Sequence, residues 1–333
     1  MKFAMNTTVP LRVGLIGVGK HARQILIPAA EQIPDAIRFV ALATGHAESA
    51  RKVESFYRLP CAVGHEAIIG NPDVEAVIIS SHDHERHAID ALEAGKHVFI
   101  ETPGITSREG ARRIRRLSQE RCLVYHVGSC LRYSPIYQKM KRLLAEWRER
   151  TPGPRTFSVR YYSYIGHFQN LLLYLAGDIT HVLNLMHADR SSAVALYRFA
   201  SGDIASITWG SFHNVAFPYE SVEIIHSSGR LIAEDGRVLR FDRMPPECAR
   251  SPLDMDFELA DAQLFNPTFS IPYGRNMQQY LRGYVPQLED FARCVRTGDT
   301  PLCGVGDAEK TLLVGEASGK SAEAGGTWVA VES

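Results

Sequence analysis

The residues with the clearest chemistry lie near the start of the chain, where an apolar stretch (11–16) runs into Gly17-x-Gly19-x-x-Ala22. Gly17 permits a tight turn, and Gly19 lets the backbone approach a ligand with no Cβ in the way. Ala22 lets the next helix pack closely, and the start of that helix offers free N–H groups and a positive dipole end. The spacing predicts a loop that binds a dinucleotide pyrophosphate; a tight turn without a ligand is the alternative.

A second polar group follows the apolar stretch 76–80, in the run Ser80-Ser81-His82-Asp83-His84. Ligands bind at the carboxyl ends of strands in a doubly wound sheet, so this run is predicted to lie near the ligand. The spacing of His82, His84 and His87 also permits a metal. Such a loop more often makes hydrogen bonds, so we expect no metal here.

The composition limits the class of protein. At 333 residues the chain predicts two domains. Lys plus Arg (37) balances Asp plus Glu (37), so no net field recruits nucleic acid or an anionic membrane. No apolar run is long enough for a bilayer and no signal-like start is seen, which predicts a cytoplasmic protein. The six cysteines form no Cys-x-x-Cys pair and are expected to be reduced thiols.

The first 130 residues alternate short apolar strands with helical stretches, which predicts an α/β Rossmann fold with a doubly wound parallel sheet. This dinucleotide-binding domain is expected over 1–130. The predicted strands are Leu11–Ile16, Phe39–Ala43, Ala76–Ser80, His97–Ile100 and Cys122–Val127. The predicted helices are Ala22–Ala30, Ser49–Tyr57, Glu85–Ala94 and Ser107–Gln119.

The pattern changes after a helix at 134–149 and a break at Thr151-Pro152-Gly153-Pro154. Longer strands with partial alternation predict an α+β domain over 131–333, with a mostly antiparallel, open-faced sheet and helices on one face. Asp235-Gly236 predicts a hairpin, and 243–276 predicts a long excursion. The predicted strands are Thr156–Tyr164, Val194–Ala200, Ala205–Phe212, Ser221–His226, Arg230–Ala233 and Val238–Phe241; the predicted helices are Phe168–His187, Pro286–Arg296 and Asp307–Ala324.

The chain resembles the glucose-fructose oxidoreductase / inositol dehydrogenase / MocA-type (Gfo/Idh/MocA) family of NAD(P)-dependent oxidoreductases. The landmarks run in family order over nearly the whole chain, and Ala94-Gly95-Lys96-His97-Val98 followed by Glu101-Thr102-Pro103 is the most specific. The others are the glycine turn, Asn71-Pro72-Asp73, Arg132-Tyr133-Ser134-Pro135, Gly153-Pro154-Arg155, Thr180-His181 and Gln287-Leu288-Glu289-Asp290-Phe291.

The resemblance implies a nicotinamide cofactor, but the sequence leaves open which one. Relatives that use NAD usually carry an acidic residue at the end of the second strand, where this chain has Thr44, and relatives that use NADP often carry an arginine where this chain has Gly45. Absence of a carboxylate removes a repulsion against a 2′-phosphate, and Arg51 or Lys52 is able to approach one, which favours NADP over NAD. Both basic residues are equally explained as solvated helix residues. The further cofactor-binding residues that we predict are Gly17, Gly19, Lys20, His21, Ser80, Ser81, His82, His84, Glu101 and Thr102.

The chain departs from the family at Thr102, which replaces the lysine of Glu-Lys-Pro. That lysine commonly acts in proton transfer, and a threonine hydroxyl cannot supply a titrating proton near neutral pH. The lysine's role is therefore not carried over to this chain.

The resemblance also implies a catalytic histidine, which we assign to His181 with help from Asp178, three residues earlier on a predicted helix. Gly177 stands where relatives have aspartate. A buried histidine bonded to backbone is the alternative. Predicted substrate-binding residues are Arg132, Tyr162, Tyr164, His167 and Asn184, although tyrosines on a strand are also ordinary packing and Arg132 equally suits a bridge between domains.

Three functions are open. The first is hydride transfer to or from a small polar substrate, of which a keto-sugar or cyclitol is the family's usual class. The second is reduction of an imine, which needs less acid help and so tolerates loss of the lysine. The third is a non-catalytic dinucleotide-binding regulator. Resemblance also implies a homo-oligomer, a dimer or tetramer.

Overall fold

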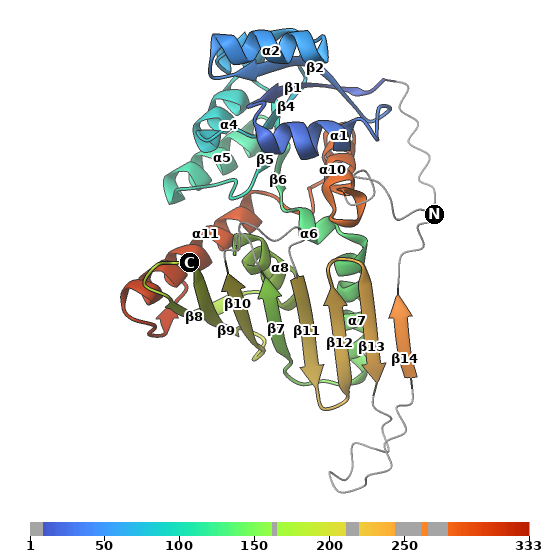
Figure 1. The fold of residues 1–333 in the computed structure, drawn as a ribbon, viewed down its shortest axis with the longest axis vertical. Helices are drawn as coiled ribbons and strands as arrows, with labels where there is room; N and C mark the ends of the chain where they lie inside the picture. The colour runs from blue at the N-terminus through green and yellow to red at the C-terminus, as the bar shows by residue number, and fades with distance from the viewer. Residues whose placement is uncertain (1–8, 162–164, 211–219, 244–260, 266–278, 333) are drawn as a thin grey trace, which may run out of the picture. The chain divides into compact units, whose positions relative to one another are not determined.

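The computed structural model describes residues 9–161, 165–210, 220–243, 261–265 and 279–332. The chain divides into two compact units (Figure 1), one made of Met1–Tyr133 with Tyr273–Glu309 and the other of Ser134–Pro272 with Lys310–Ser333. The segment that contains the helix at 284–297 therefore belongs with the first unit, although it follows the second unit's sheet along the chain.

The first unit contains a six-stranded parallel sheet in the order β3-β2-β1-β4-β5-β6. The chain order reverses between β1 and β4, which is the switch point where such sheets bind ligands. The strands are β1 (Leu11–Ile16), β2 (Ile37–Thr44), β3 (Cys61–Val63), β4 (Ala76–Ile79), β5 (His97–Glu101) and β6 (Tyr125–Gly128).

Helices cover this sheet. A π-helical turn (Ala22–Leu26) leads into α1 (Ile27–Ala30), and both pack with α10 (Tyr284–Thr297) around an apolar core that includes Leu15, Phe99 and Phe291. The remaining helices are α2 (Ala47–Tyr57), α3 (Glu66–Ile69), α4 (His84–Glu93), α5 (Arg108–Glu120) and α6 (Cys130–Tyr133). The predicted Rossmann fold is confirmed, and the three-residue β3 is an element that the sequence pattern did not indicate.

The second unit contains a nine-stranded sheet in the order β14-β13-β12-β11-β7-β10-β9-β8-β15. Its pairs are antiparallel except that β10 runs parallel to β7. The predicted hairpin is confirmed, since Asp235 and Gly236 both have positive φ between β12 and β13. The strands are β7 (Thr156–Tyr161), β8 (Ile179–Met186), β9 (Ser192–Phe199), β10 (Ile204–Gly210), β11 (Glu220–His226), β12 (Gly229–Glu234), β13 (Val238–Arg243), β14 (Asp261–Phe265) and β15 (Val329–Ala330).

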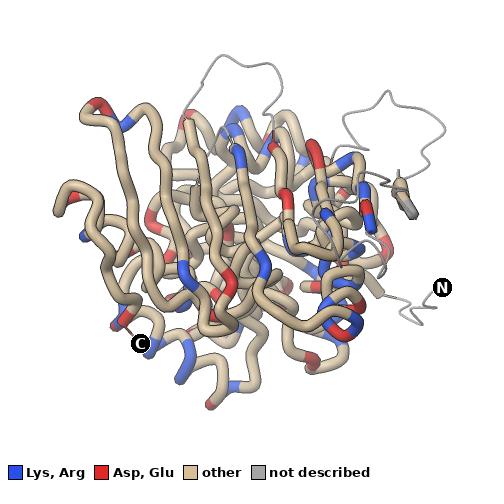
Figure 2. Tube along the Cα trace, turned by 90° about the horizontal axis from the view of Figure 1, so that it is seen from below, with Lys and Arg blue, Asp and Glu red and all other residues tan. Residues whose placement is uncertain are grey.

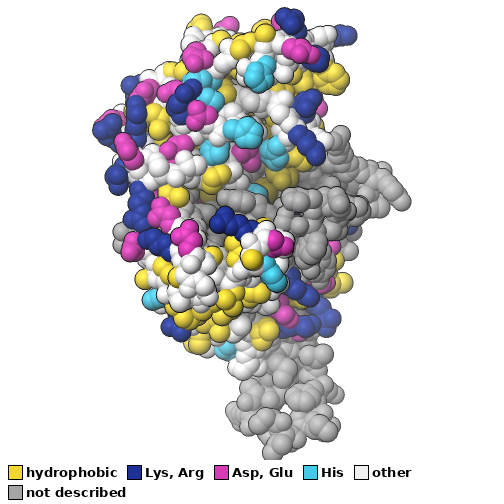
Figure 3. Space-filling model, turned by 60° about the vertical axis from the view of Figure 1, so that its left-hand side comes forward, with side chains coloured by type: hydrophobic (Ala, Val, Ile, Leu, Met, Phe, Trp, Pro, Cys, Tyr) yellow, Lys and Arg dark blue, Asp and Glu magenta, His cyan; other side chains and the backbone are white. Residues whose placement is uncertain are grey.

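The helices of the second unit are α7 (Pro135–Arg150), α8 (Gly166–Ala176) and α11 (Val305–Glu323, which begins in the first unit). Helix α7 packs on β12 and β13, behind the sheet in Figure 1. Outward-facing strand positions leave large apolar side chains exposed, among them Val194, Leu196, Ile204 and Ile225. Figure 3 shows apolar side chains gathered on a face of this unit.

The predicted helix over 168–187 is wrong in its second half. Helix α8 ends at Gly177, whose φ of 96° and ψ of −153° are accessible to glycine and strained for other residues. The next residues form β8, where Ile179 and Val182 are β-branched and buried. Pairing with β9 on one side and β15 on the other completes the strand.

Charged residues of both signs are interspersed along the trace (Figure 2). Among the described residues, no helix is long and apolar enough to cross a membrane.

Candidate functional site

The two glycines of the predicted phosphate loop occupy different environments. Gly17 has a φ of 93°, and a Cβ on it would lie 2.7 Å from the backbone of Ser80. A Cβ on Gly19 would meet nothing within 4 Å. Gly17 therefore seats the turn against the loop after β4, whereas Gly19 leaves open space above the start of the helical stretch 20–30. The first turn of a helix has N–H groups without intrahelical partners, and a pyrophosphate satisfies them.

His21 and Glu101 face one another beside this turn. The His21 Nε2 and Glu101 Oε1 atoms lie 3.4 Å apart, and both atoms are buried without a hydrogen-bond partner. Burial lowers the pKa of His21, but the Glu101 carboxylate raises it by more, so the pKa lies above its usual value. The pair supplies polar atoms that a bound cofactor is able to satisfy. Tyr284 of α10 packs edge-on against the His21 ring.

The loop after β4 is held by histidines. The Ser81 Oγ atom lies 2.7 Å from His87 Nδ1, and His84 Nδ1 lies 3.1 Å from the Ser81 carbonyl. His87 stacks on the buried His65, whose Nε2 is 2.8 Å from Asp90 Oδ2. Figure 3 shows several histidine side chains on one face of this unit. His82 is exposed, and no metal-binding group of three His, Cys, Asp or Glu exists within the described part of the chain.

Thr102 lies directly after β5, and its peptide bond to Pro103 is cis. A hydrogen bond holds this turn in place: the buried Tyr125 hydroxyl donates to the Gly104 carbonyl at 2.5 Å. The Thr102 side chain is half-buried.

The end of β2 carries no carboxylate. Thr44 is buried and its hydroxyl donates to the His46 carbonyl at 3.1 Å. Next to the glycine turn, a cavity of about 550 Å³ lies between the first helix and α2. Its walls hold three cationic and no acidic side chains; they are Lys20, Arg23, Gln24, Lys52, Val53, Phe56 and Tyr57.

His181 and Asp178 belong to the second unit and do not share a helix. His181 lies in β8, with Nδ1 3.1 Å from Thr180 Oγ1, and a bulge in the β8–β9 pairing falls between Ile179 and His181. Bulges often redirect side chains near functional sites. The Asp178 carboxylate lies 2.6 Å from Lys310 Nζ. The prediction that both side chains share a helix face is therefore wrong.

The other predicted substrate residues have varied positions. Asn184 is buried and its Nδ2 donates to Ser318 Oγ at 3.0 Å. Arg132 is buried and donates to Asp307 Oδ1 at 2.7 Å, within the first unit. His167 is half-buried near the start of α8. Tyr162 and Tyr164 lie outside the described residues.

The sequence did not predict three residues of the site. His65 and Asp90 complete the histidine network, and Tyr284 contacts His21. A short β3 places His65, and α10 arrives from far along the chain, so no local pattern marked them. The run of histidines at 82, 84 and 87 was the one available signal.

Comparison with known proteins identifies the family. Residues 11–129 match the family described as the oxidoreductase family with an NAD-binding Rossmann fold (GFO_IDH_MocA). Residues 11–129 therefore carry the NAD-binding Rossmann domain of the Gfo/Idh/MocA family. The predicted resemblance is thus confirmed, and the chain is an NAD(P)-dependent oxidoreductase with an NAD-binding Rossmann domain.

The individual proteins that match this chain are distant. The inositol 2-dehydrogenase of Agrobacterium fabrum is 35% identical over 143 residues, a match that spans 40% of each chain. The myo-inositol 2-dehydrogenase of Thermotoga maritima is 22% identical over 94% of this chain and 96% of its own. The solved levoglucosan dehydrogenase complex with NADH and levoglucosan superposes with a TM-score of 0.79 at 18% identity, covering 97% of this chain and all (100%) of that one.

A nicotinamide dinucleotide fits the first unit on structural grounds. The open space at Gly19 admits a pyrophosphate, and Lys20 places positive charge beside it. The loop at Ser80–Ser81 and the turn at Glu101 end adjacent strands β4 and β5. When bound, the cofactor supplies or accepts a hydride; the protein's part is to orient it and to hold a proton for the substrate.

Proposed function

We propose that the chain is a dehydrogenase or reductase of a small polyhydroxylated substrate, most simply a keto-sugar or a cyclitol. The observation that carries the proposal is the Gly17–Gly19 turn, packed on Ser80 at one glycine and open at the other. The inositol dehydrogenases among the relatives and the sugar-binding structural neighbour support the substrate class.

The proposed cofactor is NADP in preference to NAD. A 2′-phosphate carries two negative charges near neutral pH. The cavity beside the turn is lined by Lys20, Arg23 and Lys52, of which Lys52 pairs with Glu48 at 2.6 Å. Thr44 at the end of β2 adds no repulsion. NADH in the levoglucosan dehydrogenase complex keeps NAD as the alternative.

The proposed proton donor or acceptor is His181. An imidazole is the side chain whose ordinary pKa suits proton transfer near neutral pH. Thr102 cannot take this role, and Asp178 is engaged by Lys310. In this proposal His181 moves the proton of the substrate oxygen.

A cofactor titration combined with a substrate panel tests the proposal. Purified protein is titrated with NADPH and NADH, and then assayed with inositols, hexoses and their keto forms. We expect NADPH to bind more tightly, and Lys52→Met to weaken NADPH by about tenfold more than NADH, because one charge-assisted contact is lost. Absence of binding by either nucleotide would end the redox proposal.

Imine reduction is the second candidate, and the observation that favours it is Thr102 itself. A protonated C=N bond carries its own positive charge, so its reduction needs no lysine ammonium. Cyclic imines belong in the same panel, and turnover of sugars alone would exclude this reading.

We also propose a homo-oligomer, formed through the open face of the second unit's sheet. Large exposed patches of apolar side chains on a protein surface typically mark interfaces. Val194, Leu196, Ile204 and Ile225 alternate with buried residues along β9, β10 and β11. Light scattering of the purified protein reports the mass directly.

A further inference from the structure

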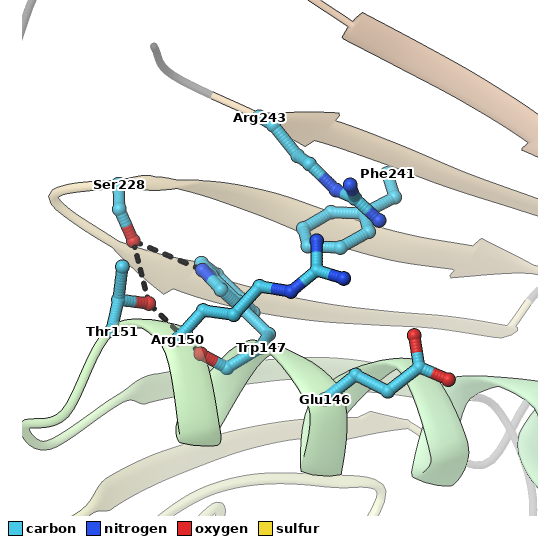
Figure 4. A pocket seen from close by; sticks show the side chains of 7 residues that line it. All are labelled: Glu146, Trp147, Arg150, Thr151, Ser228, Phe241 and Arg243. Atoms are coloured by element: carbon cyan, nitrogen blue, oxygen red, sulfur yellow. Dashed lines mark hydrogen bonds between the residues drawn. The ribbon is translucent and has the colours of Figure 1, made fainter. Parts of the chain in front are cut away.

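A second cavity, of about 250 Å³, lies wholly within the second unit, at the end of α7 (Figure 4). One wall is the last turns of α7, with Glu146, Trp147 and Arg150. The opposite wall is β13, with Phe241 and Arg243. None of these side chains belongs to the dinucleotide site described above.

The floor of this cavity is aromatic and fixed. Trp147 and Phe241 are 4% and 2% exposed, and their ring centroids lie 5.1 Å apart. The Trp147 Nε1 atom donates to Ser228 Oγ at 2.9 Å, and Ser228 Oγ donates to Thr151 Oγ1 at 3.1 Å. The indole therefore cannot rotate away, and its polar atom is already satisfied, so that the small parts of Trp147 and Phe241 that reach the cavity are apolar.

Two guanidinium groups stand over this floor without anionic partners. Arg243 lies with its Cζ 4.8 Å from the centre of the Phe241 ring, and Figure 4 shows the Arg150 guanidinium directed toward the same space. Among the described residues, neither arginine makes an ion pair or a side-chain hydrogen bond. Glu146, one turn before Arg150, does not pair with it. Two adjacent unpaired cations repel each other, and an anion between them relieves that repulsion.

The surrounding charges strengthen the positive potential. Arg155 is buried beside Trp147, with its Cζ 4.9 Å from the indole ring centre. The nearby Asp203 carboxylate is engaged by Arg148 and by the backbone N–H of Arg155. Glu146 is the only carboxylate among the lining residues. Arg150 alone is explained by the C-terminal end of the α7 dipole, but that dipole does not account for Arg243 on the facing strand.

We propose that this cavity binds a small aromatic carboxylate. Its ring packs against the parts of Phe241 and Trp147 that line the cavity, and its carboxylate lies between Arg150 and Arg243. Both parts of the ligand follow from the lining: the apolar floor favours an aromatic ring, and the two guanidinium groups favour a localised negative charge. The proposal does not depend on the dinucleotide site.

Calorimetric titration of the full chain with 2-naphthoate, and with its neutral analogue 2-naphthamide, tests this assignment. Excess NADPH is present throughout, so that the first unit's site is occupied. We expect saturable binding of the acid at one site, with the amide at least about tenfold weaker, as loss of charge-assisted hydrogen bonds implies. Equal binding of acid and amide, or no saturable binding of the acid, overturns the proposal.

Variants locate the site. Arg150→Met and Arg243→Met keep an unbranched stem and remove the charge, and each is expected to weaken 2-naphthoate by about tenfold. Glu146→Gln is expected to tighten it, because a repelling carboxylate is removed. Arg237→Met, at the exposed β12–β13 turn, is the control and should bind as the parent does. Arg150 is exposed, so its variant folds even if Arg243→Met does not; a parent-like affinity in Arg150→Met overturns the assignment.

Discussion

The Nδ1 atom of His87 lies 2.7 Å from the Oγ atom of Ser81, so that a side chain of α4 ties down the loop at the carboxyl end of β4. That loop lies at the switch point of the sheet and packs against Gly17. The hydrogen bond requires His87 to be neutral at Nδ1 if the serine hydroxyl donates to it. Loop geometry is thereby linked to pH.

The first prediction concerns this link. Burial and the neighbouring His65 lower the pKa of His87 below its ordinary value of 6.5. The unfolded chain then binds the proton first, so the contribution of His87 to stability is complete above 6.5 and is lost as the pH falls below it. His87→Asn keeps an acceptor near the Nδ1 position without titrating. We expect its thermal midpoint to fall less than that of the parent between about pH 7.5 and pH 5.5. His82→Asn, exposed on the same loop, is the control, and parallel curves for His87→Asn and the parent would contradict the link.

The second prediction concerns Thr102. Thr102→Lys restores a titrating amine after β5, and general acid–base catalysis by a positioned group contributes about 100-fold or more in rate. We expect kcat on the best sugar or cyclitol to rise by about that factor, measured by NADPH formation. Thr102→Val controls for the volume of the side chain. If the lysine brings no gain, the proton is already handled elsewhere in the chain; a gain from no detectable activity would indicate a lapsed enzyme that serves as a regulator.

The third prediction concerns His181. His181→Ala is expected to lower kcat by about 100-fold with little change in cofactor affinity, because the proposed proton transfer is lost while the first unit is untouched. His187→Ala, just beyond the end of β8, is the matched control. If His181→Ala keeps the parent's kcat, His181 does not transfer the proton, and its role is the structural contact with Thr180 in β8.

The fourth prediction concerns the stability of the first unit. Asp290 of α10 accepts hydrogen bonds from the Tyr133 hydroxyl at 3.1 Å and the Leu302 N–H at 3.2 Å, and it lies 3.4 Å from His126. Burial raises the pKa of Asp290, but His126 and Arg293 lower it by more, so the pKa lies well below its usual range. Asp290→Asn is expected to cost about 2 kcal/mol in urea unfolding, because the hydrogen bonds to a carboxylate are replaced by weaker ones to a neutral amide.

The control for that variant is Asp299→Asn. Asp299 pairs with the same Arg293 but its side chain is 58% exposed, and exposed pairs contribute about 0–1 kcal/mol. Equal destabilisation by the two variants would show that the Asp290 network adds nothing. The contribution of Asp290 is present above its ordinary pKa of 3.8 and is lost as the pH falls through the lower folded value.

The sequence predicted the elements whose signals are local. The bounds of β1 are as expected, because an apolar run is closed at once by Gly17. The helix predicted over 168–187 is wrong in its second half because apolar residues of this kind occur both in helices and in buried strands. What decides it is Gly177 and the pairing of His181 with Ala330, a partner about half the chain away. The hydrophobic periodicity of the local sequence carries no information about a pairing partner so far along the chain.

The site divides in the same way. The glycine turn was predicted from its spacing, and Glu101 was predicted from the family motif. The packing of Gly17 on Ser80 and the contact of His65 with His87 needed the sheet order, with β4 beside β1, to be known. Asp178 was assigned to His181 through a helix that does not exist there, and its carboxylate pairs with Lys310 instead.

The most direct measurement compares cofactor binding in Gly19→Val, Gly17→Val and the parent. A Cβ at Gly19 meets open space, whereas one at Gly17 clashes with Ser80 at a φ of 93°. We predict that Gly19→Val keeps the parent's thermal midpoint but loses at least about 100-fold in affinity for NADPH and NADH, since its side chain occupies the pyrophosphate's place. Gly17→Val is predicted to lower the midpoint itself. If Gly19→Val binds both nucleotides as the parent does, the glycine turn does not hold the cofactor and the account is contradicted.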